Sequence, residues 1–278
     1  MTERQGMQIV LATDGSKDAA AALAMLTSLE LRPEDEVSVI VVVPPIPVLG
    51  KELEAPRGTD APSLSDAARV IADDVVAKLR QRGVSARPET RLGNPAEEIL
   101  TCAEETGADL IVLGAKGVGS VRRFLLGSVA HRVARHASCS VLAVRGEGTL
   151  RRVLFATNGS RQSDDAVSAF LSLPLPAGLR ATVISVAPPN GDVEAAAAAS
   201  SAVASRLNQA GIDATPSTAS GNEAATIIAT AKQEESDLIV VGEGRRLSDG
   251  EPVLGPVAFG VLDGAPCSVF IGRPGPRG

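Results

Sequence analysis

The sequence predicts an α/β protein in two tandem copies, each a parallel sheet with helices on both faces. Short apolar runs rich in Val and Ile alternate along the chain with Ala-rich helical segments. This alternation is typical of a parallel sheet that is buried on both sides. It occurs twice in the 278 residues, and two domains of that size can each bury a core of their own.

The duplication is visible in the sequence itself. Residues 109–128 read DLIVLGAKGVGSVRRFLLGS, and residues 237–256 read DLIVVGEGRRLSDGEPVLGP. A constant offset of 128 residues links equivalent positions in the two copies: Asp109 and Asp237, Gly114 and Gly242, Gly127 and Gly255, Cys139 and Cys267. Because this offset holds without a gap through strand, loop and helix, it indicates a duplicated domain.

The two copies also begin alike, with QIVLATDGSKDAA in the first and RVLFATNGSRQSD in the second. Here Asp14 corresponds to Asn158 at an offset of 144, so the first copy holds an insertion between the two matched regions. The insertion falls at residues 44–62, whose Pro and Gly content predicts a surface loop. We expect one domain at residues 1–147 and a second at residues 148–278.

Individual elements of the first copy follow from local signals. Residues 65–82 show a helical apolar face that Gly83 ends. Asn94 and Pro95 open another helix, as cap and first-turn residue, which runs to Glu105. The same Gly-Asn opening recurs at residues 221–222. Strands are expected at residues 7–12, 37–43, 85–92, 110–113 and 141–144.

The composition excludes several classes of protein. A net charge of -6 without a basic run argues against a nucleic-acid partner, because that affinity depends on neutralising phosphates. No apolar run approaches the roughly 20 residues that span a bilayer, and the first seven residues lack the apolar stretch of a signal peptide. We expect a soluble cytoplasmic protein with no membrane partner. Its three cysteines form no CxxC pair, which favours small buried residues over disulfides or zinc ligands.

A glycine-rich loop is the strongest candidate for chemistry. Gly114 follows a predicted strand directly, and Gly127 and Ser128 open the next helix. Such a loop presents backbone N–H groups and the positive end of a helix to an anion, and glycines permit close approach by a ligand. The Ser128 hydroxyl can donate to a phosphate or cap the helix. The spacing is neither a Walker A loop nor a dinucleotide-binding fingerprint, and the loop alone is also compatible with a simple turn.

The pattern G-2x-G-9x-G-S, formed by Gly114, Gly117, Gly127 and Ser128, resembles the nucleotide-binding signature of the universal stress protein family. The resemblance covers the whole chain as a tandem pair, including the LATDGS opening and the SVLAVR segment at residues 140–145. It implies an adenine nucleotide alpha-hydrolase-like fold with a five-stranded parallel sheet in each copy. It also implies that the copies pair through their last strands, and that members with the complete signature bind ATP.

The resemblance also implies a set of binding residues for an adenine nucleotide in the first copy. Mg²⁺ would be carried on the phosphates rather than in a protein cage. The crevice at the carboxyl ends of the strands, where the winding of an open α/β sheet reverses, is the usual place for such a ligand. The expected contacts are Ala12, Thr13 and Asp14 for adenine and ribose, Val42 or Val43 for the adenine edge, Leu113, Gly114 and Gly117 for ribose and phosphates, and Gly127, Ser128 and Val129 for phosphates.

Other readings remain open for residues near this loop. Ser16 is also a competent helix cap. Lys116, Arg122 and Arg123 could reach phosphate oxygens, or they could be solvated. His131 and His136 are five residues apart and do not share a metal-binding face, so we expect structural or exposed side chains and no metal site.

The second copy lacks part of the signature. Arg245 stands at the position of Gly117, and Pro256 stands at that of Ser128, which removes both a hydroxyl and a backbone N–H. Asp249, Glu251 and Asp263 add negative charge nearby in sequence. We therefore expect ATP in the first copy alone.

The sequence shows no catalytic motif, since no GxSxG, HExxH or paired nucleophile and base occurs. We expect an ATP-binding regulatory or stress-response protein that is not an enzyme. Slow ATP hydrolysis, autophosphorylation and a scaffold with a vestigial site remain alternatives. Whether the tandem chain forms a further homodimer is left open.

Overall fold

A computed structural model describes residues 6–45, 64–117, 126–148, 150–189, 191–244 and 254–274. Its first half contains β1 (Gln8–Ala12), α1 (Lys17–Thr27), β2 (Glu36–Val43), α2 (Leu64–Arg80), β3 (Ser85–Leu92), α3 (Pro95–Thr106), β4 (Leu110–Gly114), α4 (Ser128–His136) and β5 (Ser140–Val144). Its second half repeats this order with β6 (Arg152–Ala156), α5 (Arg161–Leu171), β7 (Arg180–Ala187), α6 (Val193–Gln209), β8 (Asp213–Ser220), α7 (Glu223–Gln233), β9 (Leu238–Gly242), α8 (Pro256–Gly264) and β10 (Ser268–Gly272).

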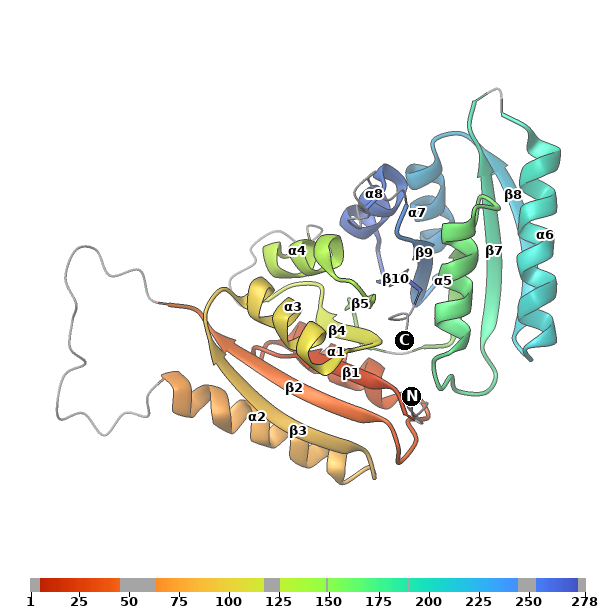
Figure 1. Ribbon diagram of the computed structural model, residues 1–278. Coiled ribbons are helices and arrows are strands. Elements are labelled where there is room, and N and C mark those ends of the chain that lie inside the picture. Colours follow the sequence, from red (N-terminus) through yellow and green to blue (C-terminus); the bar gives the residue numbers. More distant parts are fainter. Residues whose placement is uncertain are drawn as a thin grey trace, which may run out of the picture.

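The strands form one ten-stranded sheet in the order β3-β2-β1-β4-β5-β10-β9-β6-β7-β8. Within each half all neighbouring strands are parallel, whereas β5 and β10 pair antiparallel at the centre, with Leu142 opposite Phe270. The two halves therefore lie side by side, with α2 and α6 at opposite ends (Figure 1). This arrangement confirms the predicted fold class and the predicted pairing of the two copies through their last strands.

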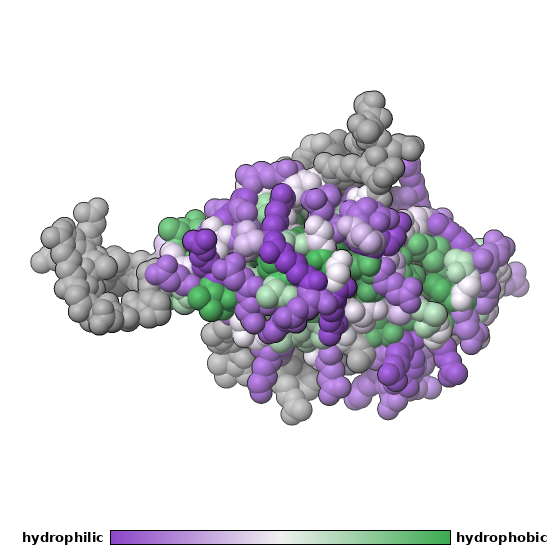
Figure 2. Space-filling model, turned by 90° about the horizontal axis from the view of Figure 1, so that it is seen from below, coloured by the Kyte–Doolittle hydropathy of each residue, from purple (hydrophilic) through white to green (hydrophobic). Residues whose placement is uncertain are grey.

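Helices cover both faces of the sheet. One continuous core cluster contains residues of α1 and α2 from the first half and of α5 and α6 from the second. A second cluster, on the other face, contains residues of α3, α4, α7 and α8. Both clusters extend across the β5–β10 junction, so burial of apolar side chains joins the halves as well as building each one. Figure 2 shows one face of the molecule, which is mainly hydrophilic with small hydrophobic patches.

Short polar side chains fix the ends of several elements. The Ser16 hydroxyl accepts from Ala19 N at 3.2 Å, and Asn94 and Asn222 cap α3 and α7. Each cap satisfies backbone N–H groups that a helix start leaves without a partner. The capping role of Ser16 and the Asn94 helix opening are thus confirmed.

The repeated aspartate that precedes β4 and β9 also has a structural role. Asp109 Oδ2 accepts from Gln8 N at 2.8 Å, and Asp237 Oδ2 accepts from Arg152 N at the same distance. Each carboxylate ties the start of one strand to the start of its neighbour. The recurrence of this residue in the DLIV motif therefore follows from the sheet.

The predicted strands agree with the observed ones to within one residue at each end. The helix expected at residues 65–82 is α2, which ends at Arg80. Most of the insertion at residues 44–62 lies outside the described residues. Within the described residues, no helix is both long and apolar enough to cross a membrane.

Candidate functional site

The carboxyl ends of β1 and β4 meet at the point where the winding of the first half reverses. In the order β3-β2-β1-β4-β5, the chain leaves β1 towards β2 on one side and later returns to β4 on the other. Ala12 lies opposite Leu113 in this pair, and Thr13 N donates to Ile40 O within β2, at 3.0 Å. Such a crevice is where open α/β sheets bind ligands.

Asp14 follows the carboxyl end of β1. Its side chain is exposed and accepts from Ser16 N at 3.0 Å, so a tight turn holds the carboxylate. A Cβ placed on Gly117 would lie only 2.7 Å from Asp14 Oδ2. The structure therefore brings together Asp14 and Gly117, which are about 100 residues apart in sequence and which we expected in one site.

The start of α4 lies beside the same residues. Gly127 N donates to Ala115 O at 2.8 Å, and a Cβ on Gly127 would be 3.4 Å from Lys116 Cα. Ser128 is the first helical residue and is exposed. The two ends of the glycine-rich loop are thus adjacent, whereas Arg122 and Arg123 lie outside the described residues.

The N-terminus of α4 differs from those of most other helices in how it is capped. Gly127, its N-cap, has no side chain with which to cap it. In the first backbone hydrogen bond of this helix, His131 N donates to Gly127 O at 2.9 Å. The first N–H groups of a helix, here those of Ser128 and Val129, have no acceptor within the helix, and Gly127 provides no side-chain acceptor. By contrast, side-chain oxygens cap α1, α3, α5, α6 and α7, from Ser16, Asn94, Ser160, Asp192 and Asn222.

Close packing against α1 explains why position 114 is a glycine. A Cβ there would lie 2.7 Å from the carbonyl carbon of Asp18 in α1. In the second copy a Cβ on Gly242 would lie 2.6 Å from Gln162 O of α5. Because both copies keep this glycine and both pack it against a helix backbone, close helix–strand packing alone accounts for it.

The two valines that end β2 face opposite sides of the sheet. Val42 is half-buried and packs, like Ala12, Leu113 and Val129, with the core cluster of α3 and α4. Val43 is buried with Ala72 on the α2 side. Only Val42 therefore shares the face on which α4 and the glycine-rich loop lie.

The second copy keeps the architecture of the loop but changes its chemistry. Gly255 N donates to Glu243 O at 2.8 Å, which repeats the contact between Gly127 and Ala115. Pro256 is the first residue of α8 and has no N–H to offer there. Asp263 lies in the last turn of α8, about 10 Å along the helix from Pro256, so its charge is remote from the loop. Arg245, Asp249 and Glu251 lie outside the described residues.

The histidines and cysteines occupy structural positions. His131 meets Phe259 of α8 edge-on, with ring centroids 5.1 Å apart, and His136 is exposed. All three cysteines are free and buried, as predicted, and burial raises the pKa of Cys139 and of Cys267 to about 12. Across the described ranges, no group of three or more His, Cys, Asp or Glu side chains could hold a metal ion.

The comparisons with known proteins all indicate the same protein family. The model of the universal stress protein family matches the chain twice, at residues 7–145 and 149–273. The chain belongs to the universal stress protein family. A universal stress protein of Methanocaldococcus jannaschii is 35% identical over 137 residues, which are 49% of this chain and 81% of that protein.

Solved structures of other universal stress proteins share the fold over nearly the full length. One from Archaeoglobus fulgidus matches with a TM-score of 0.65 at 20% identity and covers 96% of each chain. A universal stress protein from Pseudomonas aeruginosa, described as putative in its name, gives a TM-score of 0.65 at 16% identity, over 98% of this chain and 94% of that one. At such identities the likeness shows the shared two-domain fold.

Sequence reasoning missed two functional candidates in this family member. Glu243 and Arg273 form an ion pair at 3.0 Å, with 4% and 0% of their side chains exposed. The only sequence signal is that Glu243 replaces the Ala115 of the first copy. A charged residue after an apolar strand is ordinary in a loop, so this substitution does not by itself indicate burial.

Proposed function

We propose that the first domain, residues 1–147, binds ATP at the carboxyl ends of β1 and β4 and that the protein acts as an ATP-binding regulatory module in a stress response. The single observation that carries the proposal is the start of α4. Its N-cap, Gly127, supplies no side-chain hydrogen bond to the first N–H groups, and the helix begins beside Gly117, which in turn lies beside Asp14. Helix N-termini of this kind attract phosphate through their N–H groups and dipole.

The predicted residues would each bind a different part of the nucleotide. The first helical N–H groups of α4, together with the Ser128 hydroxyl and the Gly127 backbone, would hold the phosphates, and Mg²⁺ would enter with them. Asp14, whose carboxylate accepts from Ser16 N in its turn, would accept from the ribose hydroxyls. Val42, Ala12 and Leu113 share one apolar face that suits the adenine ring. Gly114 would contribute main-chain contacts only.

Gly117 would be the most sensitive of these positions. It is exposed, and the nearest atom to an added Cβ is the flexible end of the Asp14 side chain, Oδ2. A side chain at Gly117 would therefore displace the Asp14 carboxylate and fill phosphate space without disturbing the fold. The second domain has Arg245 at this position and Pro256 at the helix start, so we propose that it binds no ATP.

The test is calorimetric titration with ATP and MgCl₂ together with mass spectrometry of the purified protein. We expect one nucleotide per chain, and we expect Ser128→Ala and Gly117→Val to weaken binding about tenfold or more, since each loss of about 1.4 kcal/mol is tenfold in affinity. Pro256→Ala is the matched control, because it changes the equivalent residue of α8. Two nucleotides per chain, or wild-type affinity in Gly117→Val, would contradict the proposal.

The proposal is for binding without turnover. A hydrolase would release phosphate from ATP at a rate that falls in Ser128→Ala, and a scaffold with a vestigial site would take up no nucleotide in the same titration. Phosphate release by the wild type and by Ser128→Ala therefore separates hydrolysis from binding alone, and the titration separates the scaffold from both.

A further inference from the structure

Arg273 of the second half contacts the first half directly. It follows β10 and its side chain is fully buried. Its Nη2 donates to Ala134 O at 2.6 Å and its Nη1 donates to Cys139 O at 3.1 Å. Ala134 lies in the last turn of α4 and Cys139 lies in the segment that joins α4 to β5, so this guanidinium crosses the interface between the halves.

Glu243 fixes the guanidinium from the opposite side. Arg273 Nε donates to Glu243 Oε2 at 3.0 Å, and Glu243 O in turn accepts from Gly255 N at the start of α8. Three hydrogen bonds, one of them to Glu243, therefore fix the guanidinium, and removing either charged partner would leave an uncompensated buried charge. Glu243, which directly follows β9 in the second copy, thus holds the arginine that reaches the first half.

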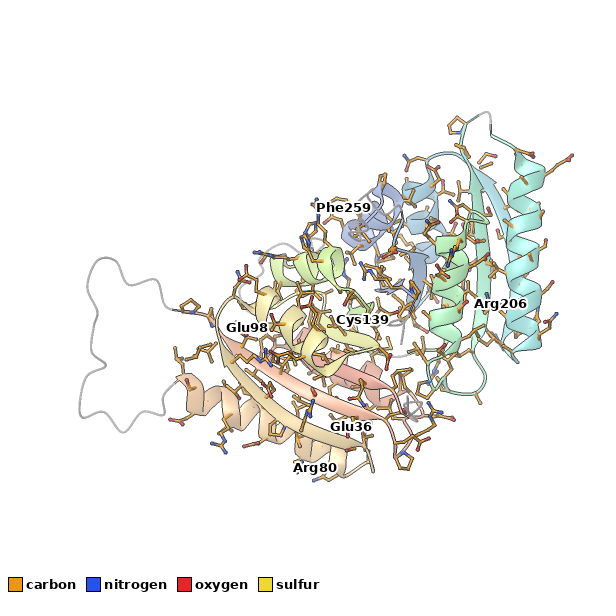
Figure 3. All side chains as sticks on the ribbon, in the orientation of Figure 1. Glu36, Arg80, Glu98, Cys139, Arg206 and Phe259 are labelled. Atoms are coloured by element: carbon orange, nitrogen blue, oxygen red, sulfur yellow. The ribbon has the colours of Figure 1, made fainter. Side chains whose placement is uncertain are left out.

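The α4 helix is also tied to α3 by an exposed ion pair, in which Arg132 Nη2 donates to Glu97 Oε1 at 2.7 Å. It buries only Ala130, Val133 and Ala134, whose small side chains remove little apolar surface from water. Carbonyls in the last turn of a helix lack partners within it, and a cation there is favourable. Arg273 supplies that cation at Ala134 O. Phe259 of the second half, labelled in Figure 3, touches the same helix through the ring of His131.

The equivalent arginine of the first half is held less firmly. Arg145 donates through Nη1 to Ala265 O at the end of α8. The position that corresponds to Glu243 is Ala115, and within the described residues Arg145 Nε is buried without a hydrogen-bond partner. Among the residues that the structure describes, the interface is therefore asymmetric, because the arginine that contacts α4 has a carboxylate partner and the arginine that contacts the end of α8 has a buried Nε without a partner.

We propose that Arg273, held by Glu243, positions α4 so that its N-terminus is aligned for phosphate. The second domain would then be a structural part of the nucleotide site in the first, although it binds no nucleotide itself. This inference rests on the proposed function. Arg273 is a positioning residue here, since it lies at the end of α4 opposite to Ser128 and acts through the helix.

The test compares three variants of the full chain. Glu243→Ala combined with Arg273→Met removes the ion pair without leaving a buried charge, and its alanine copies the Ala115 of the first domain. Arg273→Lys keeps the positive charge but lacks the planar fork that reaches three acceptors. Arg145→Met is the matched control. It removes the equivalent arginine, which contacts the end of α8, and leaves the α4 contacts intact. Thermal unfolding checks that each variant is folded.

The first readout is calorimetry with ATP and with adenosine, which lacks phosphates. We expect the double variant to bind ATP about tenfold more weakly, with adenosine affinity changed less than about twofold, because only the phosphate end depends on α4. Arg273→Lys should fall between the double variant and wild type, and Arg145→Met should match wild type. Equal weakening for ATP and adenosine would indicate general damage and overturn the inference, as would wild-type ATP affinity in the double variant.

The second readout does not depend on the nucleotide. Hydrogen exchange of the free protein should be faster at α4 in the double variant and unchanged there in Arg145→Met. If the wild type binds no ATP, the proposed function fails, and exchange at α4 alone decides whether Arg273 positions this helix. Exchange at α4 that equals wild type in the double variant would overturn the inference on its own.

Discussion

His131 and Phe259, which occupy the same position in the two copies, meet edge-on across the domain interface at an interplanar angle of 87°. Glu30 and Pro174 are a second pair of equivalent residues, and Glu30 N donates to Pro174 O at 2.8 Å. Two contacts between equivalent residues place a pseudo-twofold axis through the centre of the ten-stranded sheet. The halves are therefore related as two subunits of a dimer would be.

This symmetry leads to a prediction for the first domain alone. Residues 1–147 would expose β5, whose five residues are all buried in the full chain, and apolar strand edges of this kind seek a partner. We expect the fragment to form a dimer in sedimentation through antiparallel β5–β5 pairing. A soluble fragment that stays monomeric at all concentrations would contradict this prediction.

The packing of Gly114 predicts equal damage in the two copies. In both Gly114→Ala and Gly242→Ala the new Cβ meets helix backbone at less than 3 Å, and such overpacking costs about 1–3 kcal/mol. Gly117→Ala meets only the end of a flexible side chain and should cost less. Urea unfolding of the three variants measures this. If Gly242→Ala were neutral, the packing explanation of this glycine would be wrong.

Removal of Glu243 alone should be severely destabilising. Glu243→Ala leaves the Arg273 guanidinium buried without its carboxylate, a change that costs about 3–5 kcal/mol in comparable cases. Adding Arg273→Met should restore most of this loss, because no charge then remains buried. A double-mutant cycle of urea midpoints provides the measurement, and a single variant as stable as wild type would show that the pair is energetically unimportant.

The buried thiols predict a loss of stability at alkaline pH. Burial raises the pKa of Cys139 and of Cys267 from 9.0 to about 12, whereas the unfolded chain ionises these thiols near the ordinary value. Their contribution is therefore fully present below pH 9.0 and is lost as the pH rises through about 12. The chain has no Tyr to titrate in this range. Urea midpoints of the wild type should fall more steeply with pH than those of Cys139→Ala combined with Cys267→Ala, and identical slopes would contradict the prediction.

The sequence by itself determined the duplicated domains, the order of their elements and most element boundaries. Strands such as β4 are continuous apolar runs, and helices such as α3 begin at a polar cap followed by proline. These signals are local, because the hydrogen bonds and side-chain burial that they reflect involve neighbours within one element. The glycine spacing and the comparison between copies also indicated where a ligand would bind.

Only the tertiary structure decided which of these residues meet and which have packing roles. The close approach of Gly117 to Asp14, the packing of Gly114 on α1 and the separation of Val42 from Val43 all depend on how elements distant in sequence are placed. The burial of the Glu243–Arg273 pair could not be predicted from the replacement of Ala115 by Glu243, since that burial arises from the antiparallel pairing of β5 with β10. Charged residues carry the same letters in solvent and in a core, and the surroundings that distinguish the two exist only once both halves of the chain have come together.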